Sequence, residues 1–243
     1  DLDTFRALCG ALQALQELTS LSLGGCYLGP QALAVLAEVV FRDARAVLKK
    51  VTLSQNKLFG ADQYGRHTVD ADQSGWAALC GALPGSPVEE LDVADVGMGV
   101  TGVTSLAKAL SAGAVINSLA LGSNPIGDKA MIQLLDVLKD VSLTSFDISK
   151  TNCGVSTATK LAELLAEETA FKAVLTSVNC LNNPLGEGVH TIIKVFEEPP
   201  RLRTLCGLEE GVKNIDWSNS GKGPIDVVLL AADIKACRAV AVL

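Results

Sequence analysis

The side chains of this sequence that could do chemistry gather in one polar stretch, residues 61–73 (ADQYGRHTVDADQ). His67 is followed closely there by Asp70 and Asp72. An imidazole beside carboxylates could act as a general acid–base pair or hold a metal ion. A solvated surface loop is the alternative interpretation of the same residues. The second histidine, His190, lies in a helical pattern without a Cys or His at metal-ligand spacing, so it adds nothing to a metal site.

A literal G-x-G-x-x-G pattern occupies residues 97–102 (GMGVTG). In a dinucleotide site such glycines let the backbone approach a pyrophosphate, and an acidic residue about 20 positions later binds the ribose. Here the following strand ends in Leu121-Gly122-Ser123, with no acidic residue. We therefore assign these glycines to a turn, and we predict no cofactor, no metal ion and no catalytic residue.

The seven cysteines are dispersed and form no C-x-x-C pair. This pattern favours free thiols in a reducing compartment, which we predict to be the cytoplasm or another reducing intracellular compartment. Cys9, Cys26, Cys80 and Cys180 fall at regular positions of helices and strands. We expect these four to be small buried hydrophobic residues.

The elements that position these residues follow one repeated pattern. Leu175–Gly186 (LTSVNCLNNPLG) reads L-x-x-V-x-C-x-x-N-x-L-G, and residues 116–127 and 48–60 repeat it. The alternating apolar residues predict a short strand. The Asn is placed to bond backbone groups that the turn leaves unpaired. An amphipathic helix follows, for example over residues 128–138.

The repeats open at Leu18, Leu48, Val88, Ile116, Leu143 and Leu175, with a spacing near 28 residues. The interval from Leu48 to Val88 is 40 residues, because residues 61–73 are inserted between strand and helix. Residues 202–243 depart from the pattern. We interpret them as one irregular repeat with an enlarged entry loop, in which the strand falls near 212–216, Trp217 is in the core and a helix starts at Pro224.

Composition sets limits on function. Hydrophobic residues make up 49% of the chain but aromatic residues only 4%, and the net charge is -7. The acidic balance argues against nucleic acid as a partner and favours a basic protein, although it also serves solubility. No apolar run approaches the length of a membrane span, so we predict no membrane insertion. We treat residues 1–243 as a single domain, expected to be a fragment of a longer array.

The repeated L-x-x-L-x-L-x-x-[N/C/T/S] strands and the S-N-P-I-G-D-K-A and N-N-P-L-G-E-G junctions resemble the ribonuclease-inhibitor-like leucine-rich repeat family. The resemblance covers nearly the whole chain. It implies an α/β solenoid of about seven repeats, with a curved parallel sheet on the concave face and helices on the convex face. It also implies function through protein binding, with ciliary complexes among the places where such proteins occur.

Candidate partner-binding positions come from two places. The first is the insertion with the preceding turn, which supplies Tyr64, Arg66, His67 and Lys57. The second is the strand face that should lie opposite the helices. Its predicted members are Ser20, Ser22, Lys50, Thr52, Glu90, Asp92, Ser118, Ala120, Ser145, Asp147, Ser177, Asn179, Asn214 and Asp216. We predict Glu90, Asp92 and Asp147 as binding residues on that face, which could equally be only a solvated sheet surface.

Three functions follow from these observations. The leading hypothesis is a non-enzymatic scaffold or adaptor within a larger assembly. On that hypothesis, deletion of residues 61–73 should lower partner affinity while the thermal midpoint barely moves. The alternatives are a GTPase regulator resembling the Ran GTPase-activating protein, and an enzyme that uses His67.

Overall fold

The computed structural model describes residues 1–15, 17–41, 47–197, 201–218 and 220–236. The chain divides into two compact units, Asp1–Leu119 and Ala120–Leu243. Each unit is built from the predicted strand–turn–helix repeats and is described separately. The prediction of a single domain over residues 1–243 stays a prediction.

Short strands and helices alternate along the chain, and the strands are parallel and ordered in the sheet as they are in the sequence. The strands are β1 (Ser20–Ser22), β2 (Lys50–Thr52), β3 (Glu90–Asp92), β4 (Ser118–Ala120), β5 (Ser145–Asp147) and β6 (Ser177–Asn179). This alternation confirms the predicted leucine-rich repeat architecture.

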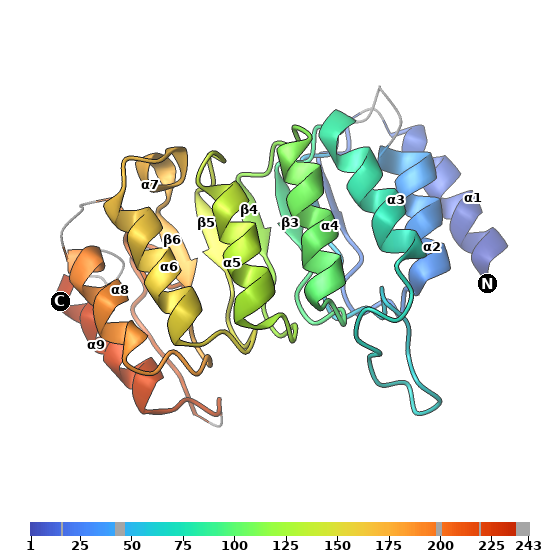
Figure 1. Ribbon diagram of the computed structural model, residues 1–243. Helices are drawn as coiled ribbons and strands as arrows, with labels where there is room; N and C mark the ends of the chain where they lie inside the picture. The colour runs from blue at the N-terminus through green and yellow to red at the C-terminus, as the bar shows by residue number, and fades with distance from the viewer. Residues whose placement is uncertain (16, 42–46, 198–200, 219, 237–243) are drawn as a thin grey trace. The chain divides into compact units, whose positions relative to one another are not determined.

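In the first unit the helices lie on one face of strands β1 to β3 (Figure 1). They are α1 (Leu2–Gln13), α2 (Pro30–Leu36), α3 (Ser74–Ala82) and α4 (Val100–Ser111), with a π-helical turn η1 (Ala37–Phe41) and a 3-10 turn η2 (Leu83–Gly85). The middle residues of β2 and β3, Val51 and Leu91, are buried against these helices. The flanking residues of the same strands, such as Lys50 and Asp92, fall on the open face, as predicted.

In the second unit helices again cover one face of the strands (Figure 1). They are α5 (Gly127–Leu138), α6 (Val155–Ala166), α7 (Ala170–Val174), α8 (Gly188–Glu197) and α9 (Pro224–Ala236). The short helix α7 accounts for the extra length of the repeat that opens at Leu143. Its Phe171 is fully buried and meets the Phe146 ring edge-on, with 6.3 Å between ring centroids.

Each repeat turns at a residue of positive φ just before the Asn position. These residues are Gly25, Gln55, Asp95, Ser123, Lys150 and Asn182. The recurrence shows that the repeats are in phase in the backbone as well as in the sequence.

The buried Asn of one repeat bonds to the backbone of the repeat before it. The Asn56 side-chain nitrogen donates to the Leu23 carbonyl at 2.7 Å, and its oxygen accepts from the Leu28 amide at 2.9 Å. In the second unit Asn183 donates to the Ile148 carbonyl at 2.7 Å and accepts from the Thr151 amide at 3.0 Å. These bonds satisfy buried backbone groups and connect neighbouring repeats, as the pattern predicted.

The expectation for the cysteines holds at three of the four positions. Cys9, Cys80 and Cys180 are buried, and burial raises the pKa of the Cys80 thiol to about 12. Cys26 is exposed, so that prediction was wrong. Cys26 lies in the repeat of the edge strand β1, which has no strand before it in the sheet. Asn56, at the same position of the second repeat, is covered by the backbone of the first repeat.

The prediction for the last strand was also wrong. Residues 202–206, not 212–216, lie alongside β6. The Val178 amide donates to the Thr204 carbonyl at 3.0 Å, and the Cys180 amide to the Leu205 carbonyl at 2.9 Å. Asn214 and Asp216 are exposed and outside any strand, and Trp217 is only half-buried.

The buried carboxylate of Asp233 explains why residues 202–206, rather than 212–216, lie beside β6. Asp233 of α9 accepts hydrogen bonds from the Thr204 hydroxyl at 2.6 Å and from the Leu205 and Cys206 amides at 2.7 and 3.1 Å. These contacts hold residues 204–206 in place, which a strand pattern in the sequence cannot reveal.

Candidate protein-binding site

The insertion, residues 61–73, leaves the first unit between β2 and α3 as a loop that extends away from the helices (Figure 1). Its base is packed into the core. The Phe59 and Trp76 rings lie 5.6 Å apart between centroids, and both side chains are fully buried. The Trp76 indole donates to the Gly102 carbonyl at 2.8 Å. The loop therefore starts and ends on a fixed part of the fold.

Asp70 attaches the insertion to the next repeat. Its carboxylate accepts from the backbone amides of Gly99, Thr101 and Gly102, at 2.9, 2.6 and 3.1 Å. These amides belong to the start of α4, where the first turn of a helix has no acceptors of its own. A carboxylate at this position also interacts favourably with the helix dipole.

The glycines of the G-x-G-x-x-G pattern make room for this contact. A Cβ on Gly99 would lie 2.7 Å from the Asp70 Oδ2 atom and 2.7 Å from the Val69 side chain. A Cβ on Gly102 would lie 2.8 Å from the Phe59 ring. The anion at this helix start is therefore the chain's own Asp70, which agrees with our rejection of a dinucleotide site.

The second unit uses the same arrangement without an insertion. Asp128 of α5 accepts from the Gly154 amide at 2.7 Å, the Thr157 amide at 3.1 Å and the Thr157 hydroxyl at 2.5 Å, all at the start of α6. Partial burial raises the pKa of Asp128, but these hydrogen bonds outweigh it, so the net pKa is lowered. Capping by an acidic residue of the preceding repeat is thus a recurrent structural device of this chain.

The acidic residues near His67 are engaged separately. The His67 Nε2 atom lies 3.2 Å from Asp95, in the turn of the next repeat. Asp72 accepts from the Ser74 amide at 2.8 Å at the start of α3, and hydrogen bonds from Ser74 lower the pKa of Asp72. The two carboxylates whose spacing had suggested a metal or acid–base site with His67 thus bind backbone amides, and His67 pairs with Asp95 instead. In the described part of the chain, no three His, Cys, Asp or Glu side chains are grouped to hold a metal ion.

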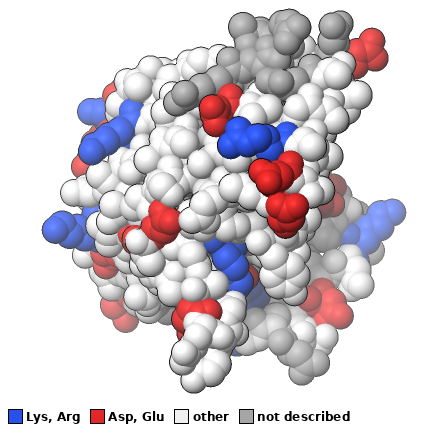
Figure 2. Space-filling model, turned by 90° about the vertical axis from the view of Figure 1, so that its right-hand side faces the viewer, with Lys and Arg blue, Asp and Glu red and all other residues white. Residues whose placement is uncertain are grey.

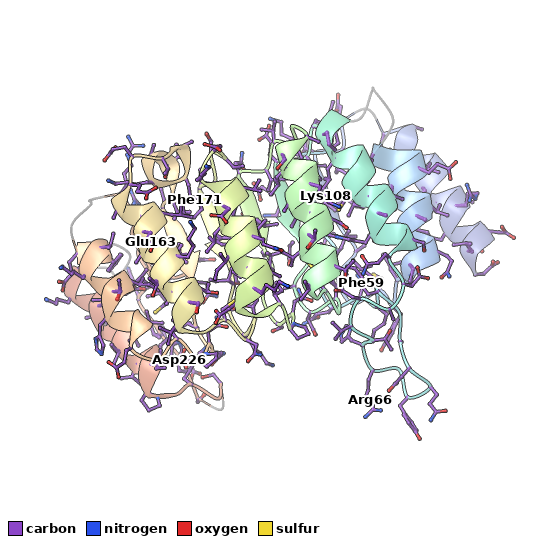
Figure 3. The ribbon with its side chains drawn as sticks, viewed as in Figure 1. Phe59, Arg66, Lys108, Glu163, Phe171 and Asp226 are labelled. Atoms are coloured by element: carbon purple, nitrogen blue, oxygen red, sulfur yellow. The ribbon has the colours of Figure 1, made fainter. Side chains whose placement is uncertain are left out.

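The tip of the insertion, residues 62–66, is organised around Asp62. Its carboxylate accepts from the amides of Tyr64 and Arg66 at 2.8 and 2.9 Å and from the Arg66 Nε at 2.8 Å. The Arg66 guanidinium stacks on the Tyr64 ring at 5.1 Å from the centroid. Figure 3 shows Arg66 at the far end of the loop, pointing away from the fold. Tyr64 and Arg66 are thus held in a defined arrangement and remain accessible.

The hydrogen bonds to Asp62 also lower the pKa of its carboxyl group. The Arg66 amide contributes most to holding the pKa of Asp62 below its ordinary value, followed by the guanidinium, the Tyr64 amide and the charge of Lys57. The positive charge of Lys57, one of the predicted binding residues, is thus among the causes that lower the pKa of Asp62.

The predicted residues of the open strand face form contacts with one another. Glu90 pairs with Lys50 at 3.0 Å, and Asp92 accepts from the Ser54 hydroxyl at 2.9 Å. In the second unit Asp147 accepts from the Asn179 side chain at 3.2 Å. Exposed pairs of this kind contribute little to stability. A binding role for Glu90, Asp92 and Asp147 stays a prediction, as does that of the insertion residues.

The sequence predicts Tyr64, Arg66 and His67 as binding residues, and that stays a prediction. It did not reveal the contacts of Asp62 and Asp95 or the role of Asp70 at the start of α4. One available signal was the glycine pattern at 97–102. A helix start with closely approachable amides requires an acceptor, and the nearby acidic insertion could have been proposed to supply it.

Comparison with known proteins completes the description. No protein-family model matches the chain. It is 31% identical to the ribonuclease inhibitor of Sus scrofa over 152 residues, which cover 55% of this chain and 33% of that protein. It is 25% identical to the Mus musculus ribonuclease inhibitor over 224 residues, covering 88% of this chain and 43% of that protein. Identity to RAN GTPase-activating protein 2 of Arabidopsis thaliana is 24% over 138 residues, covering 55% of this chain and 25% of that protein.

The chain is a leucine-rich repeat protein, because it combines alternating parallel strands and helices, in-phase turns and a ladder of buried Asn side chains, Asn56 and Asn183, that bond to the preceding repeat. These relatives support the ribonuclease-inhibitor-like family that the sequence predicted. The chain spans less than half the length of the curated relatives that it matches. Among the described residues no helix is long and apolar enough to cross a membrane.

Proposed function

We propose that this chain is a non-enzymatic scaffold that binds another protein, as a part of a larger assembly. The observation that carries the proposal is the insertion, in which Tyr64 and Arg66 are exposed at the tip of a loop that hydrogen bonds to Asp62 and Asp70 hold in a defined conformation. Binding residues on loops positioned by a rigid scaffold are a common arrangement. The two relatives named ribonuclease inhibitor support a binding role rather than catalysis.

The distribution of surface charge adds little to the argument for a particular kind of partner. Figure 2 shows basic and acidic side chains interspersed over the described part of the side that carries α1. A net charge of -7 favours protein over nucleic acid as the partner, and a basic partner in general. The free thiols of the described cysteines support a reducing intracellular compartment.

The direct test is native purification of the tagged protein followed by chemical cross-linking and mass spectrometry. The proposal expects a stoichiometric partner with cross-links at Lys57, close to the insertion, or at Lys50 on the strand face. A protein that purifies alone at physiological concentration, without cross-links at either position, would contradict it.

A second candidate is a regulator of a small GTPase. The observation that favours it is the similarity to RAN GTPase-activating protein 2. Its test is single-turnover GTP hydrolysis by purified Ran with and without this chain. Stimulation of at least tenfold supports the regulator, whereas an unchanged rate removes it.

A further inference from the structure

We propose that the tip of the insertion, residues 62–66, binds in a concave site of the partner protein. Tyr64 enters an apolar pocket of that protein, and carboxylates on the rim of the pocket bind Arg66. This inference rests on the proposed function and specifies the chemistry of the partner. It assigns recognition to a protruding loop of this chain and a cavity of the other protein.

Hydrogen bonds of Asp62 define the conformation of the tip. Besides accepting three hydrogen bonds through its side chain, Asp62 closes the turn through its backbone. Its amide donates to the Arg66 carbonyl, and its carbonyl accepts from the Gly65 amide, both at 2.9 Å. Gly65 has a φ of 73°, a conformation that glycine adopts at little cost. A pre-organised loop loses little conformational entropy on binding, so more of its contact energy appears as affinity.

Tyr64 has the exposure of an anchor. It is 73% exposed, and the Arg66 guanidinium stacks on its ring. Exposed tyrosines on rigid loops provide large contact areas at low entropic cost, and they are enriched among residues that dominate binding energy. Because the Tyr64 side chain is mostly exposed on a loop, a concave surface on the partner would bury more of it than a flat one.

The charge that is exposed at the tip indicates which side chains should surround the partner's pocket. The Arg66 side chain is 74% exposed, whereas the Asp62 side chain with which it pairs is 27% exposed. The carboxylates of Asp70 and Asp72 are directed at backbone amides of α4 and of the start of α3. A partner approaching the tip therefore meets a guanidinium before it meets a carboxylate.

Arg66 also retains donors for a partner. The Arg66 Nε and Nη2 groups contact the Asp62 carboxylate. A guanidinium carries five N–H donors in all. The remaining donors are suited to carboxylates. The tip thus has a local preference for an acidic rim, opposite to the preference for basic partners that the net charge of the whole chain gives.

The test places the photo-reactive residue p-benzoylphenylalanine at position 64 of the full chain, followed by illumination in native extract and mass spectrometry of the cross-linked peptide. The captured protein is then purified, and its affinity is measured for the unmodified chain, Tyr64→Ala, Arg66→Glu and Tyr27→Ala. Tyr27 is the matched control because it is a tyrosine of the same unit and 87% exposed, but lies in the turn of the first repeat.

The inference expects the cross-linked peptide to line a concave apolar site flanked by Asp or Glu. It expects Tyr64→Ala and Arg66→Glu each to weaken binding at least tenfold, while Tyr27→Ala changes it less than twofold. All three side chains are exposed, so thermal midpoints should change little, although Arg66→Glu also removes the pairing of Arg66 with Asp62. Equal affinity of Tyr64→Ala and the unmodified chain, or a cross-link to a flat or basic surface, would overturn the inference.

The two proposals fail in different ways. A partner that binds the strand face, with cross-links from Lys50 and undiminished affinity for Tyr64→Ala, overturns the inference and leaves the scaffold proposal standing. The absence of any stoichiometric partner in the native purification overturns the scaffold proposal itself.

Discussion

The Asp70 carboxylate lies 2.6 Å from the backbone nitrogen of Thr101, so an acidic residue of the insertion caps the helix of the next repeat. The contact joins residues 31 positions apart in the sequence. It changes the expectation for a loop deletion. Removing residues 61–73 would take away this cap together with the tip, so lost binding could not be separated from lost stability. Substitutions at the tip are the appropriate test of binding.

Replacement of Asp70 should weaken the start of α4. Asp70→Ala leaves the amides of Gly99, Thr101 and Gly102 without their acceptor, so we expect a loss of about 1–2 kcal/mol in the free energy of unfolding. Urea denaturation measures the loss, and hydrogen exchange should become faster at these three amides. Gln63→Ala, at the exposed tip, should stay within about 0.5 kcal/mol of the unmodified chain. Unchanged exchange at Thr101 in Asp70→Ala would show that the cap does not operate in solution.

Glycine at position 99 should be required because Asp70 and Val69 approach it closely. Gly99→Ala would put a Cβ 2.7 Å from both side chains, and we expect a cost of about 1–3 kcal/mol. The matched control is Gly81→Ala in α3, where a Cβ meets nothing within 4 Å. That substitution should stabilise the protein by up to about 1 kcal/mol, because alanine favours helix over glycine. Thermal unfolding of the two variants should therefore shift in opposite directions, and a parallel shift would argue against the close approach.

Loss of an Asn from the ladder should affect two repeats at once. Asn183→Ala removes the side chain that donates to the Ile148 and Cys180 carbonyls and accepts from the Thr151 and Cys153 amides; the Ile148 carbonyl keeps the Thr151 hydroxyl as a donor. Buried groups left unpaired cost about 1–3 kcal/mol each before relaxation, so we expect at least about 2 kcal/mol of destabilisation in chemical denaturation. Asn214→Ala, at an exposed position outside any strand, should have no measurable effect. Similar midpoints for the two variants would contradict the ladder's role.

The tip should lose its order in acid. The folded pKa of Asp62 lies below its unfolded value, so its contribution is present above the ordinary Asp pKa of about 3.9 and is lost as the pH falls through the folded pKa. The amide proton shifts of Tyr64 and Arg66 should therefore titrate together, with a midpoint below about 3.9, in an NMR titration. Asp62→Asn should abolish this titration. A midpoint at or above the ordinary value would show that the hydrogen bonds do not favour the carboxylate.

The sequence by itself determined the repeat and hence the fold. Alternating apolar residues specify the buried side of each strand, and the Asn position specifies the turn, because both requirements are local and recur in every unit. The same pattern predicts the insertion, since residues that break the period should leave the stack.

Only the tertiary structure decided what the unusual residues do. Asp70 acts as a helix cap, because the insertion folds back onto amides 29 to 32 residues further along the chain. Residues 202–206, not 212–216, lie beside β6, because the buried Asp233 of α9 binds that segment. Both outcomes depend on which distant backbone groups still need a partner once the repeats have stacked. A pattern of residue types does not carry that information, since it records neighbours in sequence and not unsatisfied groups in space.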